Sequence, residues 1–173
     1  MTHDELKTYI RDVPDFPKPG IMFKDITPLL RSSEALGTAC ALIADPFRNA
    51  GVTQVAAIES RGFIFGSIVA QHLNAGFIPI RKPGKLPWAR RRHEYVLEYG
   101  SDALEIHDDA LSANDRVLVV DDVLATGGTV AAATHLVRGF EATLVGIATV
   151  IELSFLNGRG KIDGVKFHSV LAY

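Results

Sequence analysis

Two adjacent carboxylates, Asp121 and Asp122, follow the apolar run Val117–Val120, and a turn rich in glycine and hydroxyl groups, Ala125–Thr129, comes soon after them. Acidic residues at the tip of a strand present acceptors to the vicinal hydroxyls of a ribose, or attract a hydrated metal ion. Glycines let the backbone approach an anion closely, and free N–H groups at the start of the next helix favour a phosphate. This combination predicts a sugar phosphate site.

The glycine turn differs from a Walker-type phosphate loop because no lysine follows its glycines. A purely structural alternative is that Asp121 caps the turn and the glycines only bend it. We favour the ligand site because the apolar run, the paired acids, the glycines and the hydroxyls all occur together within Val117–Thr129.

The surrounding chain alternates short apolar runs with helical patterns. Runs that are apolar on both faces predict the strands of a parallel sheet, because helices cover both faces of such sheets. At 173 residues the chain is expected to form a single α/β domain with a central, mostly parallel sheet and helices on both faces. We predict strands at 54–59, 77–80, 116–120 and 142–153, helices at 33–47, 62–75 and 128–140, and strand-like segments at 95–99 and 103–106 around Gly100.

Sheets of this kind bind ligands outside the carboxyl ends of their strands. Three predicted loops fall at that edge: Glu59–Gly62, Arg81–His93 and Asp121–Thr129. The second of these is basic and interrupted by prolines. We therefore expect residues from all three loops to meet at one site.

Composition narrows the possible partners. A formal net charge of −2 gives no overall reason to expect nucleic acid or an anionic membrane. We find no apolar run of transmembrane length, and the segment MTHDELKTYIRD lacks the hydrophobic region of a signal peptide. The single cysteine, Cys40, excludes an internal disulfide and favours the cytoplasm, and the scattered histidines lack metal-ligand spacing.

The stretch Val117–Thr129 resembles the phosphoribosyl pyrophosphate signature of the type I phosphoribosyltransferases. Further stretches are similar to the adenine phosphoribosyltransferases within that family: Asp15–Pro28, Glu59–Gly66, Arg81–Pro87, Tyr95–Gly100, and Ile151–Leu153 with Gly158–Arg159. The resemblance covers nearly the whole chain. It implies a type I phosphoribosyltransferase core, an N-terminal hood at residues 1–30 and a flexible active-site loop at 81–99.

The same resemblance implies a reaction in which adenine and phosphoribosyl pyrophosphate give AMP and pyrophosphate, with Mg²⁺ brought by the substrate rather than by a protein metal site. It also implies a cytoplasmic homodimer. Two alternatives stay open: a transferase for another base, such as hypoxanthine, xanthine or orotate, and a regulator that senses phosphoribosyl pyrophosphate without catalysis. A regulator that binds nucleic acid would be expected to add a basic surface or domain, which the sequence does not show.

Individual roles follow from the resemblance. Ribose and 5′-phosphate would contact Asp121, Asp122, Ala125, Thr126, Gly127, Gly128 and Thr129, and pyrophosphate would contact Ser60, Arg61, Arg81, Lys82 and Lys85. The base would lie against Met22, Phe23, Lys24, Tyr99 and Leu153. The candidate catalytic residues are Glu98, Arg61 and Lys82. A carboxylate such as Glu98 is useful because adenine must lose its N9 proton as N9 bonds to the sugar.

Several of these residues have a structural alternative. The cations around Arg81 can form a solvated loop, Leu153 can belong to the core, and strand alternation can turn Glu98 toward solvent. The run Arg90–Arg92 departs from the family pattern, which commonly has small or hydroxyl residues there. We interpret these arginines as a solvated face.

Overall fold

The computed structural model describes residues 1–96, 101–162 and 164–173. Its strands are β1 (Arg11–Pro14), β2 (Met22–Asp25), β3 (Gln54–Ile58), β4 (Gly76–Ile80), β5 (Arg90–Val96), β6 (Ser101–His107), β7 (Arg116–Leu124), β8 (Thr143–Glu152) and β9 (Phe167–Ala172). Its helices are α1 (His3–Lys7), α2 (Thr27–Arg31), α3 (Ser33–Ala44), α4 (Gly62–Leu73) and α5 (Gly128–Arg138), with 3-10 turns η1 (Asp45–Phe47), η2 (Ser154–Leu156) and η3 (Gly158–Lys161).

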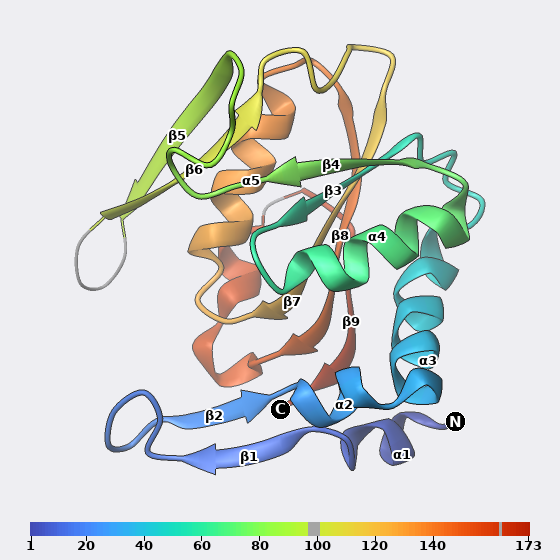
Figure 1. The fold of residues 1–173 in the computed structure, drawn as a ribbon, viewed down its shortest axis with the longest axis vertical. Helices are drawn as coiled ribbons and strands as arrows, with labels where there is room; N and C mark the ends of the chain where they lie inside the picture. Colours follow the sequence, from blue (N-terminus) through green and yellow to red (C-terminus); the bar gives the residue numbers. More distant parts are fainter. Residues whose placement is uncertain (97–100, 163) are drawn as a thin grey trace.

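Within the described ranges, five strands form a central parallel sheet in the order β4-β3-β7-β8-β9 (Figure 1). Helices α3 and α4 cover one face of this sheet and α5 covers the other. Two antiparallel hairpins stand apart from it: β1 pairs with β2, and β5 pairs with β6. The β1–β2 hairpin lies beside the C-terminus, and the β5–β6 hairpin packs on α5. The prediction of an α/β fold with helices on both faces is confirmed.

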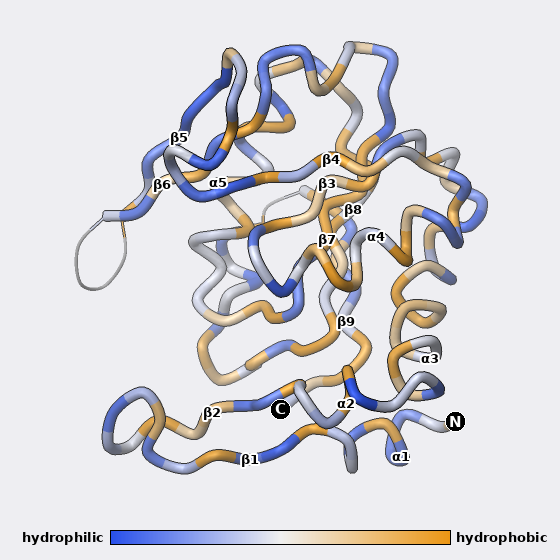
Figure 2. Tube along the Cα trace, viewed as in Figure 1, coloured by the Kyte–Doolittle hydropathy of each residue, from blue (hydrophilic) through white to orange (hydrophobic). Residues whose placement is uncertain are grey.

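Strand β7 shows why the sheet is buried on both sides. Successive side chains of a strand point to opposite faces. Leu118 and Val120 pack in the apolar cluster beneath α3 and α4, whereas Val117 and Val119 pack beneath α5, and all four are fully buried. Figure 2 shows hydrophobic residues along the central strands and hydrophilic ones along β5. An apolar run without alternation is what such a doubly covered strand requires.

Local sequence signals position the helices. The Ser32 hydroxyl accepts a hydrogen bond from the Ala35 amide at 3.2 Å and caps α3, as its position before the apolar pattern predicts. Helix α4 ends at Asn74, which adopts the left-handed conformation with φ of 53°. In the described residues, no helix has both the length and the apolar character needed to cross a membrane.

Some boundaries differ from the predictions. Strand β9 and the β1–β2 hairpin were not expected, and the segment predicted as an irregular loop at 81–93 contains the start of β5 at Arg90. The β5–β6 pairing extends from Arg90 opposite His107 to Val96 opposite Ser101. Pairing with β6 therefore imposes extended structure on a polar segment that has no apolar pattern of its own. The expected turn at Gly100 lies outside the described residues.

Close packing of α4 on β3 gives a stability prediction. An added Cβ at Gly66 would lie 2.4 Å from the Ala57 Cβ, so Gly66→Ala must push the helix from the sheet. We expect its free energy of unfolding to fall by about 1–3 kcal/mol in urea titrations. Gly37→Ala on α3 is the control, because a Cβ there meets nothing within 4 Å. That change should add about 0.5–1 kcal/mol, and equal losses in both variants would contradict the packing argument.

Candidate active site

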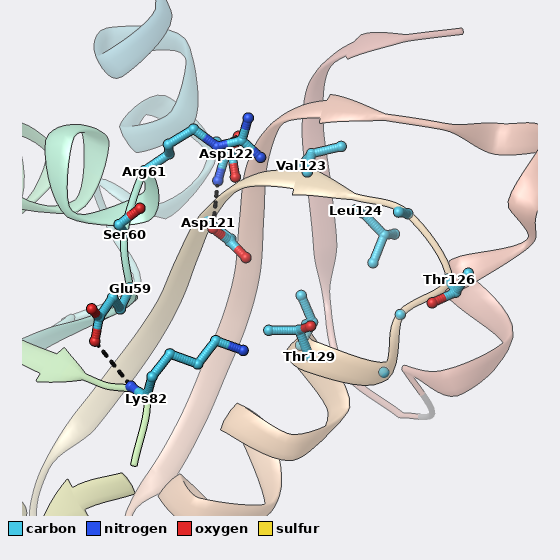
Figure 3. A pocket seen from close by; sticks show the side chains of 14 residues that line it. Glu59, Ser60, Arg61, Lys82, Asp121, Asp122, Val123, Leu124, Thr126 and Thr129 are labelled. Carbon is cyan, nitrogen blue, oxygen red and sulfur yellow. Dashed lines mark hydrogen bonds and ion pairs between the residues drawn. The ribbon is translucent and has the colours of Figure 1, made fainter. Parts of the chain in front are cut away.

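A cavity of about 280 Å³ opens at the carboxyl ends of the central strands (Figure 3). The β3–α4 loop, the start of the basic segment after β4, the end of β7 and the start of α5 all contribute to it. Its lining residues are Glu59, Ser60, Arg61, Lys82, Asp121, Asp122, Val123, Leu124, Ala125, Thr126, Gly127, Gly128, Thr129 and Val130. The structure thus brings residues of the three predicted loops to one place.

The acidic pair does not stand beyond the end of its strand. β7 continues to Leu124, and Asp121 and Asp122 are only 8% and 5% exposed. The prediction that the strand ends at Val120 and leaves both acids at the rim is wrong in this respect. The reason is that β8 pairs with β7 as far as Leu124 opposite Glu152, which extends the sheet past the apolar run.

Each carboxylate has a specific partner. The Asp121 Oδ1 accepts a hydrogen bond from the Asp122 amide at 2.8 Å, and the Asp122 Oδ2 lies 2.9 Å from Nε of Arg61. Burial raises the pKa of Asp121 well above its usual range, and the neighbouring Asp122 charge raises it further. Burial also raises the pKa of Asp122, although Arg61 acts in the opposite direction. Negative charge on the pair is therefore poorly solvated and favours hydrogen-bond donors or a cation as ligand.

The β3–α4 loop approaches the acidic pair closely because residue 62 is a glycine. A Cβ at Gly62 would lie 2.9 Å from Oδ1 of Asp121 and 3.1 Å from the carbonyl oxygen of Val120. A larger residue would move this loop and its Arg61 away from β7. The peptide bond between Glu59 and Ser60 in the same loop is cis.

The turn between β7 and α5 has the features of an anion site. Gly127 adopts φ of 81°, a conformation that glycine reaches without steric cost, and α5 begins at Gly128. The first N–H groups of a helix have no partner within it and carry the positive end of its dipole. The hydroxyls of Thr126 and Thr129 line the same cavity. This arrangement can hold a phosphate group.

The backbone at Gly158 packs closely against the turn that contains Gly127. A Cβ at Gly127 would lie 2.4 Å from the Gly158 carbonyl oxygen, and a Cβ at Gly158 would lie 2.2 Å from that of Ala125. Just after Gly158, Arg159 pairs with Glu152 through Nε at 2.5 Å and Nη2 at 2.6 Å. Hydrogen bonds from Arg159 lower the pKa of Glu152, which keeps the pair charged. The resemblance includes Ile151–Leu153 with Gly158–Arg159, but these contacts were not predicted, because they join β8, η3 and the turn at residues 125–129.

The basic segment after β4 is organised by Glu59. The Glu59 Oε2 lies 3.1 Å from Nε of Arg81 and accepts a hydrogen bond from the Lys82 amide at 2.9 Å. Burial alone would raise the pKa of Glu59, but these hydrogen bonds outweigh it and hold the pKa below its usual range. Arg81 also donates from Nη1 to the Lys85 carbonyl oxygen at 3.2 Å. Of the three predicted cations, Lys82 lines the cavity, whereas Arg81 and the exposed Lys85 do not.

Comparison with known proteins adds to this geometry. The phosphoribosyl transferase domain family matches residues 31–166. An adenine phosphoribosyltransferase of Gloeobacter violaceus is 56% identical over 98% of this chain and 99% of its own length. The crystal structure of the adenine phosphoribosyltransferase from Thermoanaerobacter pseudethanolicus has a TM-score of 0.96 and 46% identity, with 99% of this chain and 100% of that chain covered.

The chain belongs to the adenine phosphoribosyltransferase family. Another similar structure is the enzyme from Saccharomyces cerevisiae, which has a TM-score of 0.91 and 40% identity over 98% of both chains. That enzyme was crystallised with an imino-altritol bisphosphate and adenine.

Of the residues that the family resemblance assigns to the base, those that the structure describes, Met22, Phe23, Lys24 and Leu153, do not line the cavity. Phe23 faces a lining residue, since the Arg61 guanidinium carbon lies 5.6 Å from the centre of its ring. Met22 is 46% exposed, and Lys24 is bound to Asp12 at 2.6 Å. Leu153 packs partly buried against the core, which agrees with its structural alternative. Glu98 and Tyr99 lie outside the described residues.

The arginines that depart from the family pattern are exposed but not merely solvated. Arg90 lies 3.1 Å from the buried Glu105, and the Arg91 guanidinium stacks 3.7 Å from the centre of the Phe140 ring. Arg92 is the most consistent with a solvated face, since its partner Glu94 is exposed on the same strand. All three arginines are exposed, as a solvated face requires, and Arg90 and Arg91 also fasten the hairpin to its neighbours.

The pKa of Asp121 on β7 is raised and that of Asp115, just before β7, is lowered, so the two residues give opposite predictions. When a carboxyl group has a higher pKa in the folded protein than in the unfolded chain, the free energy of unfolding falls as the pH rises from the unfolded-state pKa to the folded-state pKa. Asp121→Asn should therefore raise the melting temperature of the ligand-free protein at pH 7 by about 2–4 °C, as a gain of about 1 kcal/mol would.

Asp115→Asn is the matched control. Hydrogen bonds from the Ser112 amide and hydroxyl lower the pKa of Asp115, so its charge stabilises the fold above the unfolded pKa and this contribution is lost as pH falls. Its replacement should lower the melting temperature at pH 7. Thermal unfolding between pH 4 and 8 measures both, and a destabilised Asp121→Asn variant at pH 7 would contradict the account of the buried pair.

Proposed function

We propose that this protein transfers the 5-phosphoribosyl group of phosphoribosyl pyrophosphate to adenine, giving AMP and pyrophosphate. The observation that carries the proposal is the cavity in which buried carboxylates, a donor-rich glycine turn and a lysine face one space, in a chain of the adenine phosphoribosyltransferase family. Acceptors suit the ribose diol, the turn suits the 5′-phosphate, and the cation suits the pyrophosphate. The alternative functions lack an observation that favours them.

The proposed reaction is an in-line displacement at the anomeric carbon. The bond to the pyrophosphate oxygen breaks and its electron pair goes to pyrophosphate, while N9 of adenine forms the new bond and loses its proton. Asp121 and Asp122 hold the ribose hydroxyls, and residues 125–129 hold the 5′-phosphate. Ser60, Arg61 and Lys82 face the pyrophosphate from the cavity wall, and Arg81 and Lys85 add positive charge nearby. Catalysis rests on positioning and on charge stabilisation, without a covalent nucleophile.

The size of the cavity bears on where adenine binds. At about 280 Å³ it is at the small end for a ligand site, which suits the sugar phosphate more than a complete nucleotide. We place the base at its mouth, on the side where Arg61 meets Phe23. Met22, Lys24, Tyr99 and Leu153 belong to the same proposal, as does Glu98 as the acceptor of the N9 proton. It includes residues 1–30 as a hood and 81–99 as a covering loop.

Magnesium fits this site as part of the substrate. Mg²⁺ prefers oxygen ligands and retains several waters, so pyrophosphate and ribose oxygens supply most of its coordination. In the part of the chain that the structure describes, no three His, Cys, Asp or Glu side chains form a metal cluster, but the buried acids of the cavity wall offer oxygens near the sugar. When bound, the ion would neutralise charge on the leaving pyrophosphate.

The proposal also covers the cellular compartment, the oligomeric state and the partners. A buried, unpaired Cys40 is consistent with the reducing cytoplasm. A homodimer is expected from the family. Adenine and phosphoribosyl pyrophosphate are the proposed partners, and neither nucleic acid nor membrane has a role in the reaction.

A panel of bases tests the function. The protein is incubated with phosphoribosyl pyrophosphate, MgCl₂ and adenine, hypoxanthine, xanthine or orotate, and nucleotide and pyrophosphate are quantified. We expect AMP from adenine and little product from the other bases. Product from a different base would favour the second transferase function, and binding of phosphoribosyl pyrophosphate without product from any base would favour the sensor.

The acidic pair provides a residue-level test of the same proposal. Replacing Asp121 and Asp122 together by Asn should lower turnover by about 10²–10³-fold, because the amides interact less strongly with the ribose hydroxyls and with the positive charge that develops on the sugar as pyrophosphate leaves. Circular dichroism and thermal unfolding should show a folded protein. Near-normal turnover of a folded double variant would remove the role assigned to these residues.

A further inference from the structure

The register of the β5–β6 hairpin creates a polar pair beside the cavity. Tyr95 lies directly opposite Asp102 in this antiparallel pairing, so the two side chains share a face. The Tyr95 hydroxyl lies 3.2 Å from Oδ2 of Asp102. Both side chains are partly buried, and neither lines the cavity itself.

This pair holds the ammonium group of Lys82. Nζ of Lys82 donates a hydrogen bond to the Asp102 carboxylate and lies 3.3 Å from the Tyr95 hydroxyl. Burial alone would lower the pKa of Lys82, but the bonds to Asp102 and Tyr95 outweigh it and raise the pKa. The lysine is therefore held as a cation. Asp102 correspondingly has a lowered pKa, since the Lys82 hydrogen bond outweighs the effect of burial.

Tyr95 connects Lys82 to the glycine turn at residues 125–129. Its hydroxyl lies 3.4 Å from Oγ1 of Thr129, and its ring lies 3.6 Å from the point where a Cβ of Gly128 would be. Figure 3 shows the Lys82 side chain extending toward Thr129. One network thus joins the cation, the hairpin and the first turn of α5.

Without this network, the Lys82 ammonium group would favour a different position. Its side chain has four rotatable bonds, and the same cavity contains the carboxylates of Asp121 and Asp122. An unrestrained ammonium would be attracted to those acids and would occupy the space proposed for the ribose hydroxyls. A fixed cation, in contrast, needs no reorganisation as charge develops on the leaving group.

We propose that Asp102 and Tyr95 are positioning residues, which hold the Lys82 ammonium away from the acidic pair and in place for the leaving pyrophosphate. The inference rests on the proposed function, because it concerns the transfer reaction. As the bond between the anomeric carbon and the pyrophosphate oxygen breaks, the electron pair moves to pyrophosphate, and the positioned ammonium stabilises that charge. Asp102 acts through Lys82 and does not itself contact the substrate.

A double-mutant cycle tests this proposal. Asp102→Asn should lower kcat about tenfold with less than about a twofold change in KM for phosphoribosyl pyrophosphate, since a transition-state interaction is weakened. Lys82→Ala should lower kcat further. In the Lys82→Ala background, Asp102→Asn should have almost no additional effect, because its action requires the ammonium. Asp102→Glu, which keeps the charge, should recover part of the loss.

Two further variants extend the cycle. Tyr95→Phe removes the hydroxyl and should likewise lower kcat in the wild-type background but not in the Lys82→Ala background. Asp45→Asn is the control, since Asp45 forms an exposed ion pair with Arg48 at 2.7 Å outside the site. It should leave kcat and KM unchanged. Thermal unfolding of each variant separates a catalytic loss from a folding defect.

The outcomes distinguish the two proposals. Independent, multiplicative effects of Asp102→Asn and Lys82→Ala would overturn the positioning role while leaving the transferase function intact. So would a loss in Asp102→Asn that appears only in KM, or a folded Asp102→Asn variant with normal kcat. Failure of the wild-type protein to form AMP would overturn the proposed function itself and the inference with it.

Discussion

A carboxylate loses much of its hydration when a strand carries it into a sheet, and β7 carries two in succession. Asp121 and Asp122 are buried because β8 continues to pair with β7 beyond the apolar run. Their charge is compensated by Arg61, which reaches Asp122 from the adjoining β3–α4 loop. That reach requires a glycine at position 62, where a Cβ would collide with Asp121. The acidic pair therefore dictates the conformation and composition of the neighbouring loop.

The remaining walls of the cavity are joined in the same way, each to the next by a specific contact. Glu59 connects the β3–α4 loop to the basic segment through the Lys82 amide, and the Lys82 side chain connects that segment to Asp102 on β6. Tyr95 then reaches Thr129 at the start of α5, and the turn at residues 125–129 packs on Gly158. Side chains restrained from several elements keep a binding geometry before the ligand arrives, which is the main structural requirement for catalysis by positioning.

The parts of this structure that sequence could predict are those determined by neighbouring residues. The Ser32 cap, the doubly apolar β7 and the glycine turn before α5 each have a local signal. Strand β9, the length of β7 and the β5 strand depend on pairing with segments distant in the chain, and a single sequence does not encode that pairing visibly. The same limit applies to the candidate site: Lys82 could be predicted from its basic segment, whereas Asp102 and Tyr95 come together with it only through the hairpin register.

Electrostatics predict that the ligand-free site lowers the free energy of unfolding of the protein. Its two buried acids have raised pKa values, so they favour protonation, while Lys82 is held as a cation by a carboxylate outside the cavity. Placing that cation directly on Asp121 and Asp122 would compensate their charge, but it would fill the cavity and take Lys82 away from Asp102. The separation leaves acceptors on one wall and a restrained cation on another. In the proposed reaction, a substrate with a hydroxyl-bearing sugar and an anionic leaving group would contact both walls at once, and the improved compensation of charge would be a source of binding free energy.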